Sequence, residues 1–276
     1  MEFTGSDKYY LNPELRLIVN MAVKMEKPLL LTGEPGTGKT QLAFEISRTL
    51  EMPIEVLRAK STIKGEEVCY TQDTVLRLND ARFGGGKTKR DVDEFYDYVI
   101  WGPIGRAFCS EERVVLLLDE IDKTESDVQD NLLDVLEESE FTIREVNEII
   151  KAKIKPVIVI TSNAKRELSD PFLRRCFCHH IPFPKPEEMI EIIKLHFPDV
   201  GQGLMDAALK IFYELRDRGY EKPPATSELL NWIEALMISG EKPQDANDVP
   251  YLGTLLKRTT DILSYRKLEK ISNKRW

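Results

Sequence analysis

The sequence predicts an α/β domain with a parallel sheet, followed by a small helical domain. Short apolar runs alternate with segments of helical periodicity up to about residue 180, as in parallel sheets with crossover helices. Three prolines between residues 182 and 186 end this alternation, and only helical periodicity follows. We therefore expect an α/β domain over residues 1–182 and a helical domain over residues 183–276.

The first elements are marked by a helix start. Asn12-Pro13-Glu14 combines an N-cap, a first-turn proline and an acid near the positive end of the helix dipole, and we expect this helix to reach about Met25. A buried strand, a glycine-rich loop, a helix and a second strand are expected at residues 29–31, 33–38, 42–50 and 54–58.

The middle of the domain is less regular. We expect helices over residues 73–81 and 91–109, with a flexible loop at 84–86 between them. The apolar run Val114–Leu118 suits a strand that is buried on both faces.

The last part of the α/β domain should contain a helix, a hairpin and a strand. Ser126 and Gln129 have capping-box spacing and should open the helix. We expect strands over residues 141–143 and 149–154 to pair across Asn147-Glu148, and Val157–Ile160 to be a further buried strand.

The helical domain shows two apolar faces at helical spacing, with Gly219 and Gly240 as expected C-caps. The two faces consist of Leu204, Ala207, Ala208, Ile211, Phe212 and Leu215, and of Leu229, Leu230, Ile233, Leu236 and Met237.

Composition excludes several classes of protein. The 276 residues are 42% hydrophobic and 31% charged, which suits a folded domain, and the net charge of −8 argues against a general nucleic-acid binder. The start of the chain lacks a signal-like pattern, and the apolar runs are too short to span a membrane. Four cysteines are too few for a disulfide scaffold, so we expect a reduced, cytoplasmic protein without membrane insertion.

The glycine-rich loop fits the phosphate-binding pattern G-x-x-x-x-G-K-[ST]. Its glycines let backbone N–H groups surround phosphate oxygens, while Lys39 would reach the β- and γ-phosphates of a nucleotide and Thr40 would bind Mg²⁺. The alternative is a glycine-rich turn without a ligand, but the preceding strand and following helix favour the nucleotide. The loop consists of Gly33, Glu34, Pro35, Gly36, Thr37, Gly38, Lys39 and Thr40.

Further polar residues follow two of the expected strands. Asp119 and Glu120 end the strand at 114–118, so Asp119 would hold Mg²⁺ directly or through water, and Glu120 would take a proton from attacking water. Asn163 ends the strand at 157–160 and is either a turn residue or a group that orients water. Arg174 and Arg175 are either solvated or aimed at a neighbouring subunit's nucleotide.

Together these features resemble AAA+ ATPases, a family of P-loop NTPases, and most closely their MoxR-type branch. The resemblance extends from about Tyr9 to about Leu236. The stretches that carry it are KPLLLTGEPGTGKT, WGPIGRA, VVLLLDEID, LEESEFTI, VIVITSN, LSDPFLRRC and PPATSELL.

The resemblance implies a three-layer AAA+ core and a helical lid, assembled into a ring, with a hexamer expected, that hydrolyses ATP with Mg²⁺. It adds Gln41 to the nucleotide-binding loop, makes Asn163 a sensor and makes Arg174 or Arg175 an arginine finger that acts on the neighbouring subunit. MoxR-type proteins often work with a partner that carries a von Willebrand factor A domain. The hairpin near residues 141–154 would be the branch's insertion before the sensor strand, and residues 61–90 would hold a second inserted loop.

One stretch departs from the family pattern. Many AAA+ proteins place an arginine in the helical domain near the γ-phosphate, but residues 223–228 contain none. We therefore assign no second sensor.

Three other features of the sequence are not assigned to the expected nucleotide site. Residues 176–180 place two cysteines beside two histidines, but they lack the paired spacing of a zinc site and suit a strand. The segment Gly84–Thr88, with the basic residues that follow, is more consistent with a solvated loop than with a pore loop. Tyr9 and Tyr10 either stack near a nucleotide base or pack on the core.

The expected function is an ATP-driven ring motor that remodels or activates a protein partner. A nucleic-acid loader or helicase is the alternative, and the acidic composition disfavours it. A nucleotide-dependent switch is a third possibility, which the general base Glu120 disfavours.

Overall fold

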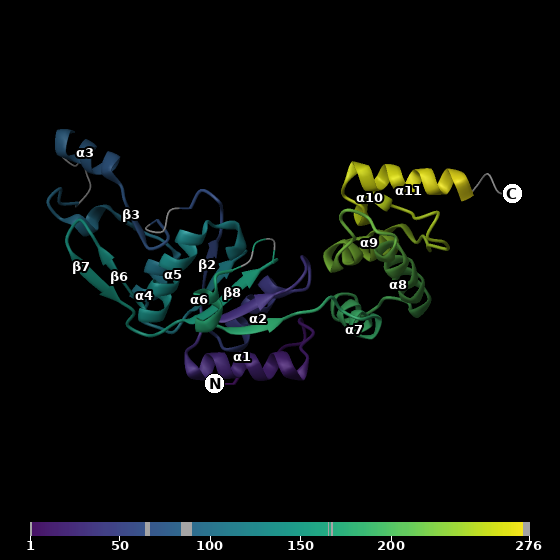
Figure 1. Ribbon diagram of the computed structural model, residues 1–276, viewed down its shortest axis with the longest axis horizontal. Helices are drawn as coiled ribbons and strands as arrows, with labels where there is room; N and C mark the ends of the chain where they lie inside the picture. Colours follow the sequence, from purple (N-terminus) through teal and green to yellow (C-terminus); the bar gives the residue numbers. More distant parts are fainter. Residues whose placement is uncertain (1, 64–66, 84–89, 165, 167, 273–276) are drawn as a thin grey trace. The chain divides into compact units, whose positions relative to one another are not determined.

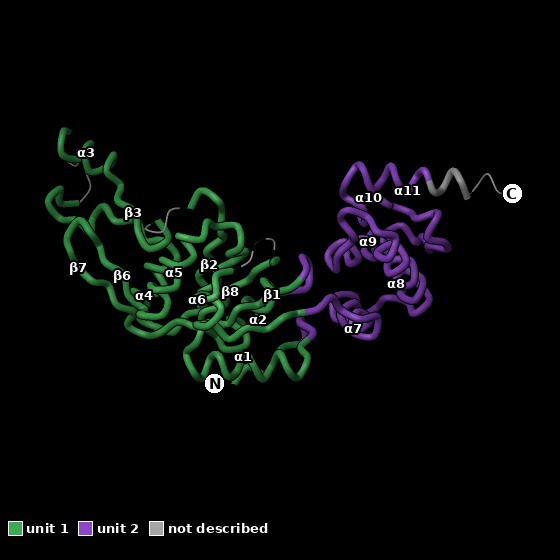
Figure 2. The backbone as a smooth tube through the Cα atoms, in the orientation of Figure 1, with its two compact units in different colours: residues 1–6, 11–33, 39–181 green, residues 7–10, 34–38, 182–276 purple. Residues whose placement is uncertain are grey.

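The computed structural model describes residues 2–63, 67–83, 90–164, 166 and 168–272. The chain divides into two compact units, which Figure 2 colours separately. The first unit holds residues 1–6, 11–33 and 39–181, and the second holds residues 7–10, 34–38 and 182–276. The predicted division into a nucleotide-binding core and a lid, at residues 182 and 183, remains a prediction.

The first unit is built on a five-stranded parallel sheet (Figure 1) with the strand order β2-β5-β8-β1-β9. This confirms the predicted parallel α/β fold. All four residues that pair β5 with β8 are apolar and buried on each strand, as expected for a strand covered on both faces. The strands are β1 (Leu29–Thr32), β2 (Ile54–Arg58), β5 (Val115–Asp119), β8 (Val157–Ser162) and β9 (Phe177–His180).

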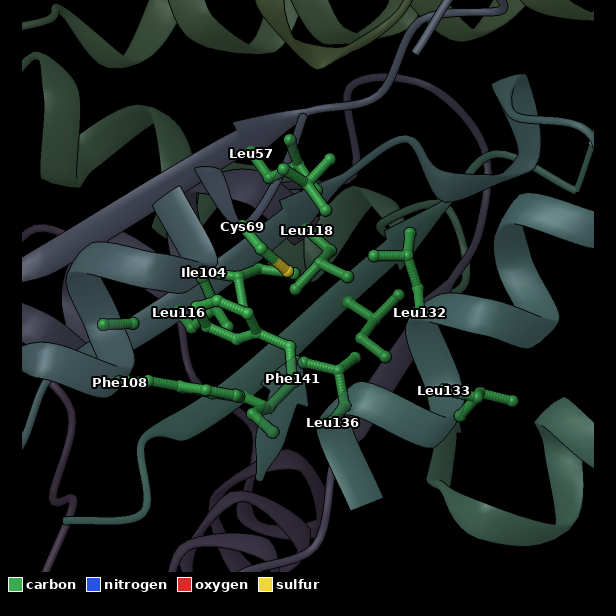
Figure 3. Packing of buried hydrophobic residues seen from close by; sticks show 14 of the residues in the cluster. Leu57, Cys69, Ile104, Phe108, Leu116, Leu118, Leu132, Leu133, Leu136 and Phe141 are labelled. Carbon is green, nitrogen blue, oxygen red and sulfur yellow. The ribbon is translucent and has the colours of Figure 1, made fainter. Parts of the chain in front are cut away.

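Helices cover both faces of this sheet. On one face, side chains of α4, α5 and α6 form a core with Leu116, Leu118 and their neighbours, and Figure 3 shows Phe108, Leu136 and Phe141 beside them. Side chains alternate along a strand, so Leu117 lies on the opposite face, where α2 contacts β5 and β8. The helices are α1 (Pro13–Met25), α2 (Lys39–Thr49), α4 (Pro103–Cys109), α5 (Ser126–Glu138) and α6 (Asp170–Arg175).

Two small antiparallel sheets extend the first unit. One pairs β3 (Tyr70–Gln72) with β4 (Val99–Trp101), and the other pairs β6 (Glu140–Ile143) with β7 (Glu148–Lys151). The second confirms the predicted hairpin, although its second strand begins at Glu148 and ends at Lys151 rather than extending over 149–154. Asn147, in the turn, has a left-handed backbone with φ of 51°. The helix predicted over 73–81 is α3 (Thr74–Phe83).

The helix predicted over residues 91–109 is wrong in its first half. Those residues form a 3-10 turn, η1 (Phe95–Tyr98), and then β4, before α4 begins at Pro103. The run Val99–Trp101 is β-branched and aromatic, which favours a strand. A proline at the first helical position then starts α4 rather than continuing an earlier helix. The loop predicted at 84–86, and the segment Gly84–Thr88 that contains it, lie outside the described residues.

The predicted capping box at α5 is also wrong. Glu125 is the N-cap, so Ser126 already lies inside the helix. The Gln129 amide instead donates hydrogen bonds to the carbonyl oxygens of Ile121 and Thr124. The same glutamine therefore ties α5 to the turn that follows β5, which is the 3-10 helix η2 (Ile121–Lys123).

The second unit has a helical core around the fully buried Trp232. Both predicted apolar faces supply this core, from α8 and α9. Gly240 caps α9 with a left-handed backbone, and Gly219, with φ of 74°, follows the end of α8. The helices are α7 (Pro186–His196), α8 (Gln202–Asp217), α9 (Thr226–Ser239), α10 (Leu252–Leu255) and α11 (Thr259–Ser272).

Among the described residues, the model contains no helix that is both long and apolar enough to cross a membrane.

Candidate functional site

The carboxyl ends of β1, β5 and β8 meet at one edge of the sheet, because these strands are neighbours and parallel. Asp119 is the last residue of β5 and Thr161 lies near the end of β8. Thr40, in the first turn of α2, donates a hydrogen bond of 2.7 Å from its hydroxyl to Oδ1 of Asp119. The Thr161 hydroxyl donates to the same oxygen at 2.8 Å, so Asp119 joins the start of α2 to β8.

Glu120 occupies a backbone conformation that is unusual for its residue type. Its φ is 58°, in the left-handed region, and it starts the 3-10 turn after β5. Its backbone N–H donates to the Thr161 hydroxyl at 2.8 Å, and its Oε1 accepts from the Asn163 amide at 2.8 Å. The turn at Glu120 and the hydrogen bond from Asn163 thus fix the orientation of the Glu120 carboxylate.

Lys123 contacts the other oxygen of Glu120 in an ion pair. The hydrogen bond to Glu120 raises the pKa of Lys123, and the nearby Asp122 and Asp119 add to this effect. Lys123 therefore stays cationic at neutral pH.

The glycine-rich loop follows β1 and leads directly into α2. Lys39 is almost fully buried, and its ammonium donates to the carbonyl oxygen of Gly33 at 2.9 Å. Gly36 and Gly38 have φ values of 81° and 86°, which L side chains rarely adopt. This backbone presents the N-terminus of α2 at the sheet edge, where an anion is favoured.

The tip of this loop, residues 34–38, packs within the second unit. A Cβ on Gly36 would lie 2.7 Å from the Cβ of Ala225, and one on Gly38 would lie 3.2 Å from the Tyr9 ring, so neither position leaves room for a side chain. Pro35 is exposed, and the Thr37 hydroxyl donates to the carbonyl oxygen of Glu34.

Arg216 of α8 makes an ion pair of 2.8 Å with Glu34. Its guanidinium lies 3.4 Å from the centre of the Phe183 ring and also donates to the carbonyl oxygen of Pro224. Only residues 223–228 were considered for an arginine of the helical domain, so Arg216 was not predicted. No sequence signal marks the pair, because 182 positions separate its partners.

The remaining predicted residues are not part of the hydrogen-bonded series around Asp119. Gln41 is exposed on α2, and its amide contacts Glu45 on the next turn of the same helix. Arg175 at the end of α6 is held by Asp134 at 3.1 Å and by Glu137 at 2.8 Å, both on α5. Arg174 is exposed and has no ion pair within the described part of the chain.

Most of the stretch with two cysteines and two histidines forms β9 (Phe177–His180), as predicted, with its side chains alternating between opposite faces, while Cys176 precedes the strand as the C-cap of α6. Cys178 and His180 are exposed whereas His179 is buried. Burial raises the pKa of the Cys176 thiol to about 12, with a smaller contribution from Cys178, so this side chain is neutral at physiological pH. No metal-binding group of three or more histidine, cysteine or acidic side chains occurs among the described residues.

Two residues of the site were not assigned a role from the sequence. Thr161 is fully buried and contacts both Asp119 and Glu120, yet the sequence indicated it only as part of a strand end. Asp122 is also buried, and it accepts a hydrogen bond of 3.2 Å from the backbone N–H of Asn163. Thr161 lies in the polar run Thr161-Ser162-Asn163 at the carboxyl end of β8, two residues before the predicted sensor, and this position is the signal that would have found it.

The donor set at Asp119 suits a small, hard cation. The Asp119 carboxylate and the Thr40 hydroxyl, which are hydrogen-bonded to each other, both offer oxygen atoms to a metal. Mg²⁺ prefers oxygen ligands and is usually bound through one or two carboxylates beside phosphate groups. The residues present therefore fit Mg²⁺ bound together with a nucleotide.

Comparison with known proteins places most of this site inside one family. Residues 28–176, more than half of the chain, match the model of the AAA domain (dynein-related subfamily). The sequence matches none of the curated proteins with which it was compared.

Solved structures share the fold. One variant of RuvB from Thermotoga maritima is 20% identical, with a TM-score of 0.56, over 92% of this chain and 72% of that chain. A second RuvB variant is 20% identical, with a TM-score of 0.53, over 89% of this chain and 69% of that chain. NtrX from Brucella abortus, solved in complex with ADP, is 18% identical, with a TM-score of 0.53, over 92% of this chain and 56% of that chain. At these identities the likeness concerns the fold alone.

Proposed function

The chain belongs to the dynein-related subfamily of AAA domains, and from this premise we propose that it hydrolyses ATP at the carboxyl edge of its parallel sheet. The observation that carries the proposal is the hydrogen-bonded series from Thr40 through Asp119 and Thr161 to Glu120. This series connects the start of α2, where the phosphates would bind, to Glu120, a general base that a protein using ATP only as a switch would not need.

The glycine-rich loop and Lys39 bind the phosphates of ATP. Backbone N–H groups at the start of α2 and the Lys39 ammonium supply positive charge to the β- and γ-phosphates. A phosphate oxygen accepts a stronger, charge-assisted hydrogen bond from the Lys39 ammonium than the neutral carbonyl of Gly33 does.

Thr40 and Asp119 hold Mg²⁺, which neutralises phosphate charge when it is bound. Glu120 orients the attacking water and accepts its proton. Asn163 keeps the Glu120 carboxylate in place through its 2.8 Å hydrogen bond and responds to changes at the γ-phosphate as a sensor.

An arginine finger completes the site from a neighbouring subunit. Arg175 is engaged by two acids of its own chain, whereas Arg174 is exposed. Arg174 is therefore the better candidate to reach a neighbour's γ-phosphate, with Arg175 fixing the end of α6. Head-to-tail contacts of this kind close into rings, and we propose a hexamer.

The motifs and the hairpin β6–β7 support a motor of the MoxR type. We propose that it remodels or activates a protein partner in the cytoplasm, in cooperation with a protein that carries a von Willebrand factor A domain. The net charge of −8 disfavours nucleic acid as the partner.

The test is ATP hydrolysis by the Glu120→Gln variant. This substitution keeps the hydrogen bond from Asn163 but removes the proton acceptor, so we expect ATP to bind with normal affinity. Its turnover should fall by about 10²–10⁴-fold, the usual contribution of a general base. Binding is measured by titration with a fluorescent ATP analogue, and turnover by phosphate release.

The matched control is Glu112→Gln, which neutralises an exposed carboxylate before β5 and should hydrolyse ATP at the wild-type rate. Wild-type turnover in Glu120→Gln would contradict the proposed mechanism. Stimulation by added DNA or RNA in the wild-type protein would contradict the choice of a protein partner.

A further inference from the structure

A large groove lies in the first unit, away from the sheet edge that carries Asp119. Its volume is about 1320 Å³, and residues of β3, α5 and β6 line it together with the short segments beside them. Small-molecule sites usually have volumes of about 300–1,000 Å³, so this groove exceeds the size that a small cofactor requires.

The described residues that line the groove are strongly acidic, because they include five carboxylates and one guanidinium, that of Arg144. Three of the carboxylates are engaged by the protein itself, at Asp134, Glu140 and Glu145. Glu67 and Glu138 are exposed and form no ion pair with any described residue. Negative charge is therefore available to a ligand at these two positions.

The groove also offers aromatic and amide groups. The rings of Tyr70 and Phe141 stack with centroids 6.0 Å apart, and the Tyr70 hydroxyl donates to Glu145 at 2.8 Å. Nε2 of Gln72 is buried and has no hydrogen-bond partner among the described residues.

Two of the strands that line the groove also have open edges. Strand β3 pairs only with β4 and β6 pairs only with β7 within the described structure, so each has one edge without a strand neighbour. Such edges present backbone N–H and C=O groups that an extended chain can pair with.

We propose that this acidic groove binds an extended segment of a protein partner that carries lysine or arginine side chains. The carboxylates of Glu67 and Glu138 pair with the cationic side chains, and the open strand edges can pair with the backbone of the segment. Nucleic acid is excluded, because its phosphates would be repelled by the same carboxylates.

The identification of the partner as the client of an ATP-driven motor rests on the proposed function. Binding of a cationic segment in the groove does not itself require ATP hydrolysis. Asp134 gives it a mechanical consequence, since this residue both lines the groove and holds Arg175. A cationic segment in the groove competes with Arg175 for that carboxylate.

The test uses a fluorescein-labelled peptide of ten residues in which arginine and valine alternate. Its binding to the full chain is measured by fluorescence anisotropy, with a peptide of alternating glutamate and valine as the negative probe. The variant Glu67→Gln/Glu138→Gln removes the two available carboxylates with little change in shape. The loss of two exposed charge pairs predicts an affinity that is about two- to thirtyfold lower.

The matched control is Asp217→Asn/Glu234→Gln, which removes the same charge from exposed positions of α8 and α9. It should bind the arginine peptide within about twofold of wild type, because neither residue lines the groove. Thermal melting of each variant checks that the fold is retained.

Three results would overturn the proposal: an equal loss of affinity in both double variants, binding of the glutamate peptide, or spermine binding as tightly as the peptide. The last would assign the groove to a small cation. Failure of the proposed function is recognised separately, because the groove variant should still hydrolyse ATP and Glu120→Gln should still bind the peptide.

Discussion

One buried hydroxyl connects the two acids of the candidate site. The Thr161 hydroxyl donates a hydrogen bond to Asp119 and accepts one from the backbone N–H of Glu120. One side chain therefore holds two consecutive residues at the end of β5. This arrangement holds Glu120 in its left-handed conformation, which costs about 1–3 kcal/mol for a residue with a side chain. The position of the proposed general base therefore depends on a residue that touches no substrate.

Replacement of Thr161 by valine tests this dependence. Thr161→Val keeps the shape but leaves the Glu120 N–H without its partner, which should lower the free energy of unfolding by about 1–3 kcal/mol. Turnover should fall more than ATP affinity, because the carboxylate of Glu120 loses its fixed direction. Phosphate release, nucleotide titration and thermal melting measure the three quantities.

The control is Thr161→Ser, which retains the hydroxyl and should recover most of the turnover. If valine and serine give the same rate, the hydroxyl has no part in positioning Glu120.

At the scale of elements, the sequence predicted what is encoded locally. The strands β1, β5 and β8 were predicted because each is an apolar run with polar residues at its carboxyl end. The loop after β1 was predicted because a fixed pattern of glycines, Lys39 and Thr40 defines it. Their meeting at one edge follows from the parallel order of the strands.

Elements that depend on distant partners were not predicted. Strand β4 has only three residues and exists because it pairs with β3, so its segment was taken for part of a helix. Gln129 has capping-box spacing, but its amide is used by the turn after β5. Arg216 lies among the charged residues of an ordinary helix, and only the fold brings it to Glu34.

The contact between α8 and the loop tip leads to a prediction for Arg216. Arg216→Ala removes the stack on Phe183, the hydrogen bond to Pro224 and the ion pair with Glu34. We expect the unfolding free energy to fall by about 1–3 kcal/mol and KM for ATP to rise, since the loop tip loses its tether. Steady-state kinetics and thermal melting measure both effects.

Glu34→Gln separates these contributions, because it breaks the ion pair alone. Glu34 is 55% exposed, so the loss should be below about 1 kcal/mol and KM should rise by less than about fivefold. An unchanged KM in Arg216→Ala would show that α8 does not restrain the loop.

At the scale of the whole molecule, Arg174 and Arg175 predict how subunits cooperate. A finger that acts on a neighbour's nucleotide gives activity per subunit that rises with protein concentration as rings form. Arg174→Ala should lose hydrolysis but bind ATP normally. A mixture of Arg174→Ala and Glu120→Gln subunits, each inactive alone, should recover part of the activity, because some interfaces then pair an intact Glu120 with an intact Arg174.

Arg175→Ala is the comparison in this experiment. It frees Asp134 and Glu137 and should act mainly through the stability of α6. The absence of recovery at every mixing ratio, with co-assembly confirmed by mass, would show that Arg174 does not act across subunits.

The second unit is assembled from three separate segments of the chain, which limits how the chain can be divided into independent fragments. The backbone passes from one unit to the other after residues 6, 10, 33, 38 and 181, rather than once at a single linker. A fragment ending at Ile181 would keep residues 34–38 but lack Arg216 and Ala225, their neighbours within the second unit. A fragment beginning at Pro182 would lack the loop tip against which those residues pack. Truncation at the proline-rich segment therefore yields two incomplete pieces, and separate production of either half is a poor substitute for the intact polypeptide.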